Sequence, residues 1–136
     1  LEEAEENYKK AIFFNSKYAH AYFNLGITLH ELNRFQDAEK SYKEAINLNC
    51  NYAEAYNNLG ITLNSLKKLK DSEKCYKKAI DLKPNYAEAY NNMGLVLKDQ
   101  GKFDDARLAY SNALEKNANN PLLQMKFDNL SVSAAQ

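Results

Sequence analysis

Residues 53–60 read AEAYNNLG, and 34 positions later residues 87–94 read AEAYNNMG. The same stretch occurs 34 positions earlier, where residues 19–26 read AHAYFNLG. The rest of each copy keeps this step, with a small residue four positions before a tyrosine: Ala38 and Tyr42, Ser72 and Tyr76, Ala106 and Tyr110. This period, with small residues at fixed places in two amphipathic segments, predicts stacked helix-turn-helix units that bury their apolar faces against one another.

The repeated residues resemble the tetratricopeptide repeat family, whose pattern has an aromatic residue, then Leu-Gly, then Ala-x3-aromatic, then proline. The resemblance covers nearly the whole chain. It implies an all-α fold, a right-handed superhelical solenoid of helix-turn-helix repeats. It also implies that the first helix of each repeat lines a concave groove and that a protein or peptide ligand is held there.

The period divides the chain into repeats. Three complete repeats are predicted at residues 19–52, 53–86 and 87–120, each with a first and a second helix. Residues 1–18 are predicted to be a half repeat with a second helix only. Residues 121–136 are predicted to form a capping helix and tail, because proline is favoured at the first position of a helix. The expected total is seven major helices and a terminal cap helix.

The predicted half repeat lacks its first-helix partner. Its apolar positions (Ala4, Tyr8, Ala11 and Ile12) are therefore short of cover, which predicts self-association at this end. The chain begins with Leu1 inside a repeat, so we expect it to be a piece of a longer protein.

Two features of the helices can be predicted locally. One glycine lies inside each first helix, where it costs about 1 kcal/mol relative to alanine and therefore indicates close approach of the paired helix. These glycines are Gly26, Gly60 and Gly94. The starts of three helices are expected to be capped by asparagines, at Asn51, Asn85 and Asn120, the first two with a glutamate three residues later.

The composition narrows the classes of partner. Of the 136 residues, 45% are hydrophobic and 26% are charged, as in a globular domain. Eighteen basic residues balance eighteen acidic ones, so neither nucleic acid nor a membrane surface is expected as a partner. Cys50 and Cys75 form no Cys-x-x-Cys pair and are interpreted as reduced thiols of a cytoplasmic protein.

The sequence contains no arrangement of residues that predicts catalysis. His20 and His30 are the only histidines, and ten residues of helix place them about 80° apart around the axis, so they cannot share a metal ion. Neither a phosphate-binding glycine loop nor a nucleophile elbow is present. We therefore expect no enzyme activity, no metal and no cofactor.

The groove is predicted from what remains on the first helices after the core positions are removed. The predicted lining residues are Asn24, Asn57, Asn58, Asn91, Asn92, Ile27, Ile61, Leu95 and Asn64. A carboxamide both donates and accepts hydrogen bonds, so one asparagine per repeat could hold a peptide backbone. The alternative is that Asn24, Asn58 and Asn92 bond the backbone of the neighbouring repeat.

Two subfamilies bear on the ligand. Chaperone cofactors of this family grip a peptide carboxylate with a set of residues of which only Asn58 is present here, so that interpretation fits poorly. The row of Asn24, Asn58 and Asn92 is similar to the asparagine ladder of protein O-linked N-acetylglucosamine transferases, which implies a substrate-binding arm. A structural spacer or self-assembly scaffold of a larger protein is the remaining alternative.

Overall fold

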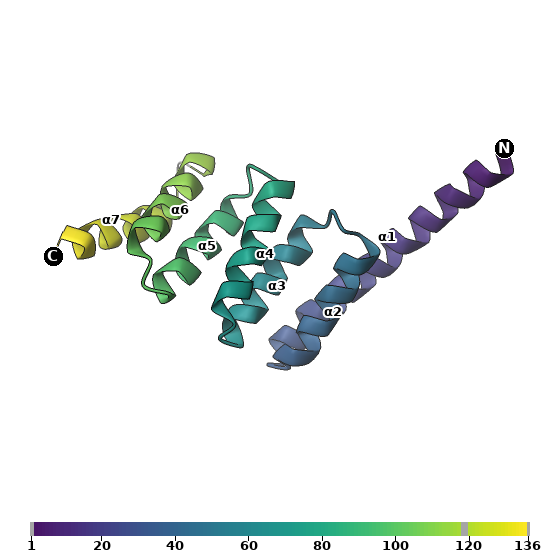
Figure 1. The fold of residues 1–136 in the computed structure, drawn as a ribbon, viewed down its shortest axis with the longest axis horizontal. Coiled ribbons are helices and arrows are strands. Elements are labelled where there is room, and N and C mark those ends of the chain that lie inside the picture. Colours follow the sequence, from purple (N-terminus) through teal and green to yellow (C-terminus); the bar gives the residue numbers. More distant parts are fainter. Residues whose placement is uncertain (1, 118–119, 136) are drawn as a thin grey trace.

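The structure is a computed structural model that describes residues 2–117 and 120–135. Within these residues every regular element is a helix (Figure 1). The helices are α1 (Glu2–Glu31), α2 (Phe35–Leu48), α3 (Ala53–Ser65), α4 (Leu69–Leu82), α5 (Ala87–Asp99), α6 (Phe103–Lys116) and α7 (Pro121–Ala135). The predicted all-α repeat fold is confirmed.

The helices stack in sequence order, with α1 and α7 at opposite ends (Figure 1). Each helix packs on the next along the chain. In addition, α1 contacts α3 and α3 contacts α5, whereas the second helices α2, α4 and α6 have no comparable contacts with one another. The first helices therefore approach each other more closely than the second helices do, so the stack bends toward them and they line its concave side.

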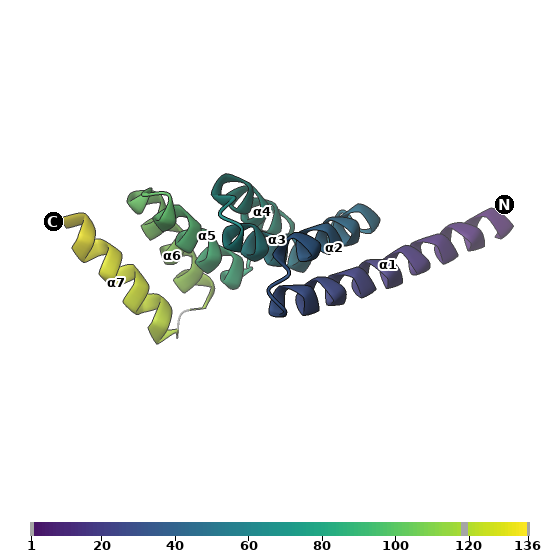
Figure 2. The same cartoon turned by 90° about the horizontal axis from the view of Figure 1, so that it is seen from below.

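The N-terminal region differs from the prediction. Residues 2–31 form one continuous helix of 30 residues, so the break expected near residues 15–18 is wrong, and seven helices replace the predicted eight in the described part of the chain. The N-terminal half of α1, drawn in purple, lies away from the other helices in both views (Figures 1 and 2). The equivalent junction one repeat later lies between α2 and α3. There the chain turns, and α2 before the turn is held in place because it packs on α1. Among the described residues no other helix holds residues 2–14 in that way, and the helix continues through the junction.

Each repeat is closed by a tyrosine ring that lies on the glycine of the first helix. A Cβ atom built on Gly60 would lie 2.5 Å from Cε1 of Tyr76, and the other two repeats have the same arrangement. Beside this contact, the Ser72 hydroxyl donates a hydrogen bond of 2.6 Å to the Gly60 carbonyl oxygen. The predicted close approach is therefore present, and the tyrosine ring makes the closest contact.

The turns inside the repeats share one backbone conformation. Asn33, Lys67 and Gly101 stand 34 residues apart and all have positive φ angles, of 61°, 64° and 78°. After α3, the Lys68 N–H donates to the Leu63 carbonyl and the Lys67 N–H to the Asn64 carbonyl. This is the Schellman arrangement, which satisfies carbonyl groups at the end of a helix.

The helix starts confirm one predicted cap and correct two. The Leu123 N–H donates a hydrogen bond of 3.2 Å to Oδ1 of Asn120, which caps α7. In contrast, α3 and α5 begin after Tyr52 and Tyr86, and neither start has a side-chain cap bond. The caps predicted at Asn51 and Asn85 are therefore wrong.

Candidate functional site

The concave face carries two hollows. The first-repeat hollow has a volume of about 210 Å³ and lies between α1, α2 and α3. Its lining residues are Ile27, His30, Glu31, Tyr42, Asn58 and Ile61. Three of them (Ile27, Asn58 and Ile61) are residues that the sequence predicted to line the groove.

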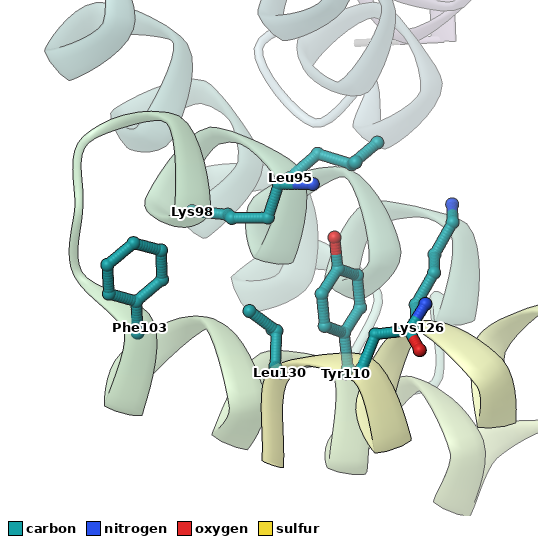
Figure 3. Close-up of a pocket in the computed structure, with 7 residues that line it drawn as sticks. Leu95, Lys98, Phe103, Tyr110, Lys126 and Leu130 are labelled. Carbon is teal, nitrogen blue, oxygen red and sulfur yellow. The ribbon is translucent and has the colours of Figure 1, made fainter. Parts of the chain in front are cut away.

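The third-repeat hollow is larger, about 390 Å³, and lies between α5, α6 and α7 (Figure 3). Its lining residues are Leu95, Lys98, Phe103, Tyr110, Lys126, Asn129 and Leu130. Figure 3 shows the Tyr110 hydroxyl pointing toward the α5 side chains Leu95 and Lys98, with Lys126 of α7 beside the ring. Burial raises the pKa of Tyr110 to about 12, so its hydroxyl stays protonated at neutral pH and can donate a hydrogen bond.

The two hollows are built from equivalent positions. Adding 68 residues, or two periods, to five lining positions of the first-repeat hollow gives five lining positions of the third-repeat hollow. The equivalent pairs are Ile27 and Leu95, His30 and Lys98, Tyr42 and Tyr110, Asn58 and Lys126, and Ile61 and Asn129. The third-repeat hollow therefore has two lysines where the first-repeat hollow has a histidine and an asparagine.

The two central asparagine positions differ in exposure. Asn57 has an exposed fraction of 0%, and its Oδ1 accepts a hydrogen bond of 3.0 Å from Nδ2 of Asn92. Burial raises the pKa of Tyr86 to about 12 despite a side-chain hydrogen bond with Asn57. Asn57 thus links neighbouring repeats, and its prediction as a surface residue of the groove is corrected, because no ligand can reach it in this structure.

The other predicted lining residues are accessible. Asn24 is exposed, and the remaining predicted residues (Ile27, Asn58, Ile61, Asn64, Asn91, Asn92 and Leu95) are partly buried. Asn58 also forms a side-chain hydrogen bond with Tyr42, a core residue of α2. Burial raises the pKa of Tyr42 to about 12, although the hydrogen bond with Asn58 acts in the opposite direction. Asn58 and Asn92 thus bond side chains of neighbouring repeats, whereas the alternative interpretation named the backbone.

Sequence reasoning missed Lys126 as a groove residue. Nζ of Lys126 donates a hydrogen bond of 3.2 Å to Oδ1 of Asn91, which repeats the link between Asn92 and Asn57 one junction later. The signal was available, because Lys126 stands 34 residues after Asn92. His30 stands in the same row of first-helix positions as Asn64 and Lys98. It lines the first-repeat hollow and shares a hydrogen bond of 2.9 Å with the Thr62 hydroxyl.

Ion pairs on the second helices link neighbouring repeats on the opposite face. Glu73 in α4 contacts Nζ of Lys77 at 2.8 Å and Nζ of Lys102, which precedes α6, at 3.4 Å. Burial alone raises the pKa of Glu73, but hydrogen bonds from Lys77, Gln100 and Lys102 outweigh it and lower the pKa to about 2. These lysines are therefore paired with a carboxylate rather than forming a basic stripe.

The described residues also contain no group of three or more histidine, cysteine or acidic side chains placed to hold a metal ion. Among the helices of the described part, none is both long and apolar enough to cross a membrane.

Comparison with solved structures shows the same fold in other proteins. The first TPR of Spaghetti (RPAP3), bound to the HSP90 peptide SRMEEVD, is 21% identical with a TM-score of 0.86, over 89% of this chain and 96% of that one. The Arabidopsis OM64 TPR domain is 20% identical with a TM-score of 0.84, over 88% and 98% of the two chains. MamA is 33% identical with a TM-score of 0.72, over 76% of this chain and 60% of that one.

Sequence comparison assigns the family. No curated protein matches the chain significantly. The family model described as TPR repeat matches residues 1–33, 28–67 and 62–101, and the model described as tetratricopeptide repeat matches residues 87–120. These matches extend over most of the chain and agree with the helix-turn-helix period of the structure. The chain therefore belongs to the tetratricopeptide repeat family.

Proposed function

We propose that this chain is a protein-interaction module that binds an extended peptide in its concave groove. The module comprises complete repeats at residues 19–52, 53–86 and 87–120, with residues 1–18 before them and the helix of residues 121–136 after them. The observation that carries the proposal is the pair of equivalent hollows at the two ends of the groove. The family relationship and the fold shared with a TPR domain bound to an HSP90 peptide support it.

The spacing of the hollows suits a short peptide. Neighbouring helices pack about 8 to 10 Å apart, so hollows separated by two repeats lie on the order of 20 Å apart. An extended chain advances about 3.3 Å per residue, so about six residues of peptide would connect them. Asn58 in the first-repeat hollow and Asn92 on the next first helix offer carboxamides that can donate to and accept from the peptide backbone.

The two hollows differ in the side chain that they favour. Ile27, Ile61 and the Tyr42 ring give the first-repeat hollow apolar walls. Lys98 and Lys126 line the third-repeat hollow, which favours an acidic side chain of the peptide. A peptide with an apolar residue about six positions from a glutamate would therefore bind in one direction only.

Calorimetric titration with synthetic peptides tests the proposal. The probes are octapeptides with leucine and glutamate six positions apart, alongside versions with the glutamate changed to glutamine. We expect Lys98→Gln to weaken the glutamate peptide and to leave the glutamine peptide unchanged. Changing both Asn58 and Asn92 to alanine should weaken both peptides by about 5-fold to 150-fold, for two lost hydrogen bonds.

Lys74→Gln on the opposite face is the matched control and should leave both affinities unchanged, because Lys74 is exposed on α4. Binding of neither peptide, or equal weakening by Lys98→Gln and Lys74→Gln, would contradict the proposed groove.

Self-association is a second role, and a separate observation favours it. Phe13, Phe14 and Tyr18 are exposed on α1, and their rings lie next to one another. Exposed aromatic side chains gathered on one segment are typical of a contact surface. A scaffold role in a larger protein would use this surface rather than the groove. In the substrate-binding arm of a glycosyltransferase, the other candidate, Asn24, Asn58 and Asn92 would hold substrate as they would hold a peptide.

A further inference from the structure

One stripe of positions runs the length of α1. The positions recur at alternating intervals of four and three residues, the spacing of a helix face that packs against another helix. They are Ala4, Tyr8, Ala11, Asn15, Tyr18, Tyr22, Leu25 and Leu29. The first three match positions of the second helices, the last three match positions of the first helices, and Asn15 and Tyr18 match positions in the turns between them. The continuous helix has therefore joined, in one line, two surfaces that pack against each other elsewhere in the chain.

Three positions in the C-terminal half of the stripe are uncovered, whereas Leu29 is buried in the core. Leu25 is 46% exposed, whereas Leu59, the equivalent residue of α3, is 4% exposed because α2 packs over it. Tyr18 and Tyr22 are also exposed, at 55% and 38%. The helix that should cover them is residues 2–14, by its sequence a second helix, but in the continuous α1 it points away and cannot reach them.

A second copy of the chain supplies the missing cover. We propose that two copies associate through an antiparallel pair of α1 helices, in which residues 2–14 of each copy cover residues 18–25 of the other. This pairing rests on the self-association proposed above and specifies its geometry. The contact is reciprocal, so both copies use the same surface and a two-fold axis relates them.

The register of the pair comes from contacts inside the chain. Tyr42 of α2 and Leu59 of α3 pack in one core cluster, and 34 residues earlier the same positions are Tyr8 and Leu25. We set Tyr8 of one copy against Leu25 of the other. In an antiparallel pair, a residue of one copy then faces the residue of the other copy whose number brings the sum of the two to 33.

The remaining stripe positions fit this register. It places Ala11 against Tyr22 and Asn15 against Tyr18. The last pair also has a counterpart inside the chain, because Nζ of Lys83 lies 4.5 Å from the ring centroid of Tyr86, and these residues stand 68 positions after Asn15 and Tyr18. The fourth pair would be Ala4 with Leu29, but Leu29 is already buried in its own chain, so the proposed contact uses the positions from Tyr8 to Leu25.

Sedimentation velocity of the full chain over a wide concentration range tests the association. We expect a dimer at high micromolar concentration and a monomer for Leu25→Glu. Leu108→Glu is the matched control, because Leu108 is also an exposed leucine, at 63%, but lies on α6. A monomer at every concentration would overturn both the pairing and the self-association, and would assign the stripe to a partner helix of other sequence.

Site-specific cross-linking tests the register. Asn15→Cys and Tyr18→Cys are made separately in a Cys50→Ser background, because Cys50 is an exposed free thiol. Under mild oxidation, we expect a disulfide-linked dimer from the mixture of the two variants and little from either variant alone. A dimer that forms mainly between two copies of the Asn15→Cys variant, or one that persists when Leu25→Glu is added, would overturn the antiparallel pairing and leave self-association standing.

Discussion

Nδ2 of Asn92 in α5 donates a hydrogen bond of 3.0 Å to Oδ1 of Asn57 in α3. The bond connects the first helices of two repeats on the concave side, and Lys126 and Asn91 form the same connection between α7 and α5. Asn92 is only partly buried, so one side chain both links repeats and remains accessible to a ligand. The two interpretations of the asparagine row are therefore compatible at this position.

Substitution of single asparagines should separate these two roles. Asn92→Ala removes the bond to the buried Asn57, so we expect the free energy of unfolding to fall by about 1 to 2 kcal/mol, because a buried acceptor is left without its donor. Asn24→Ala should leave it within about 0.5 kcal/mol, because alanine is the better helix former and Asn24 is exposed. Urea denaturation of the two variants measures the difference. Equal stability of both would contradict the linking role of Asn92.

Glu73 should make the stability depend on pH in the acid range. Its folded pKa is about 2, below the ordinary value of 4.5, so its contribution is complete above pH 4.5 and is lost as the pH falls toward 2. Glu73→Gln removes that charge, so we expect it to lower the free energy of unfolding by about 1 to 2 kcal/mol at neutral pH. The free energy of unfolding of the variant should also fall less than that of the parent chain as the pH is lowered. Urea denaturation along a pH series measures both. A variant with the same pH dependence as the parent chain would refute this assignment, and the exposed Glu115→Gln is the control.

Gly60 should not tolerate a methyl group. Alanine at this position gains about 1 kcal/mol in helix propensity, but its Cβ would lie 2.5 Å from the Tyr76 ring, so we expect a net loss of about 1 to 3 kcal/mol. Ser65→Ala, at the exposed end of the same helix, is the control for propensity. Thermal unfolding of Gly60→Ala, Tyr76→Leu and the double variant should show a coupling between the two positions. Additive losses would mean that the ring and the glycine do not interact.

Lys67 should be replaceable by glycine with a gain in stability. Its φ of 64° costs a residue with a side chain about 1 kcal/mol, whereas glycine adopts this conformation freely, as Gly101 does at the equivalent position. We therefore expect Lys67→Gly to raise the melting temperature and Gly101→Lys to lower it by a similar amount. Calorimetry of both variants checks the prediction, and a loss of stability in Lys67→Gly would contradict it.

The repeat period predicted the parts of the fold that depend on packing between neighbours. The helices from Phe35 to Lys116 occur where the period placed them, and α7 begins at Pro121 with the predicted cap. Both outcomes follow from signals carried by the residues themselves: small residues opposite tyrosines, and a proline after an asparagine.

Two features could not be predicted from local sequence, because they depend on how other helices pack. Asn57 and Asn58 are adjacent and identical in type, but α5 packs over the first and leaves the second partly open, and no local signal separates them. By comparison with the other repeats, residues 15–18 are expected to form a turn. Such a turn forms only where the helix before it is packed against an earlier helix. Within the described residues no such helix packs on residues 2–14, and sequence similarity between repeats could not show this.

The unequal spacing of the two faces has a mechanical consequence. The first helices touch one another across the repeat junctions. Each second helix packs on the first helix of the next repeat and is linked to the following second helix through ion pairs, such as that of Glu73 with Lys102, which precedes α6. Bending the array further inward compresses packed side chains, which resist compression strongly. Opening it stretches the few hydrogen bonds between first helices, such as that of Asn92 with Asn57, which cost far less. The chain is therefore a spring that is stiff in closing and soft in opening, and a long ligand can be accommodated by a small uncoiling at each junction.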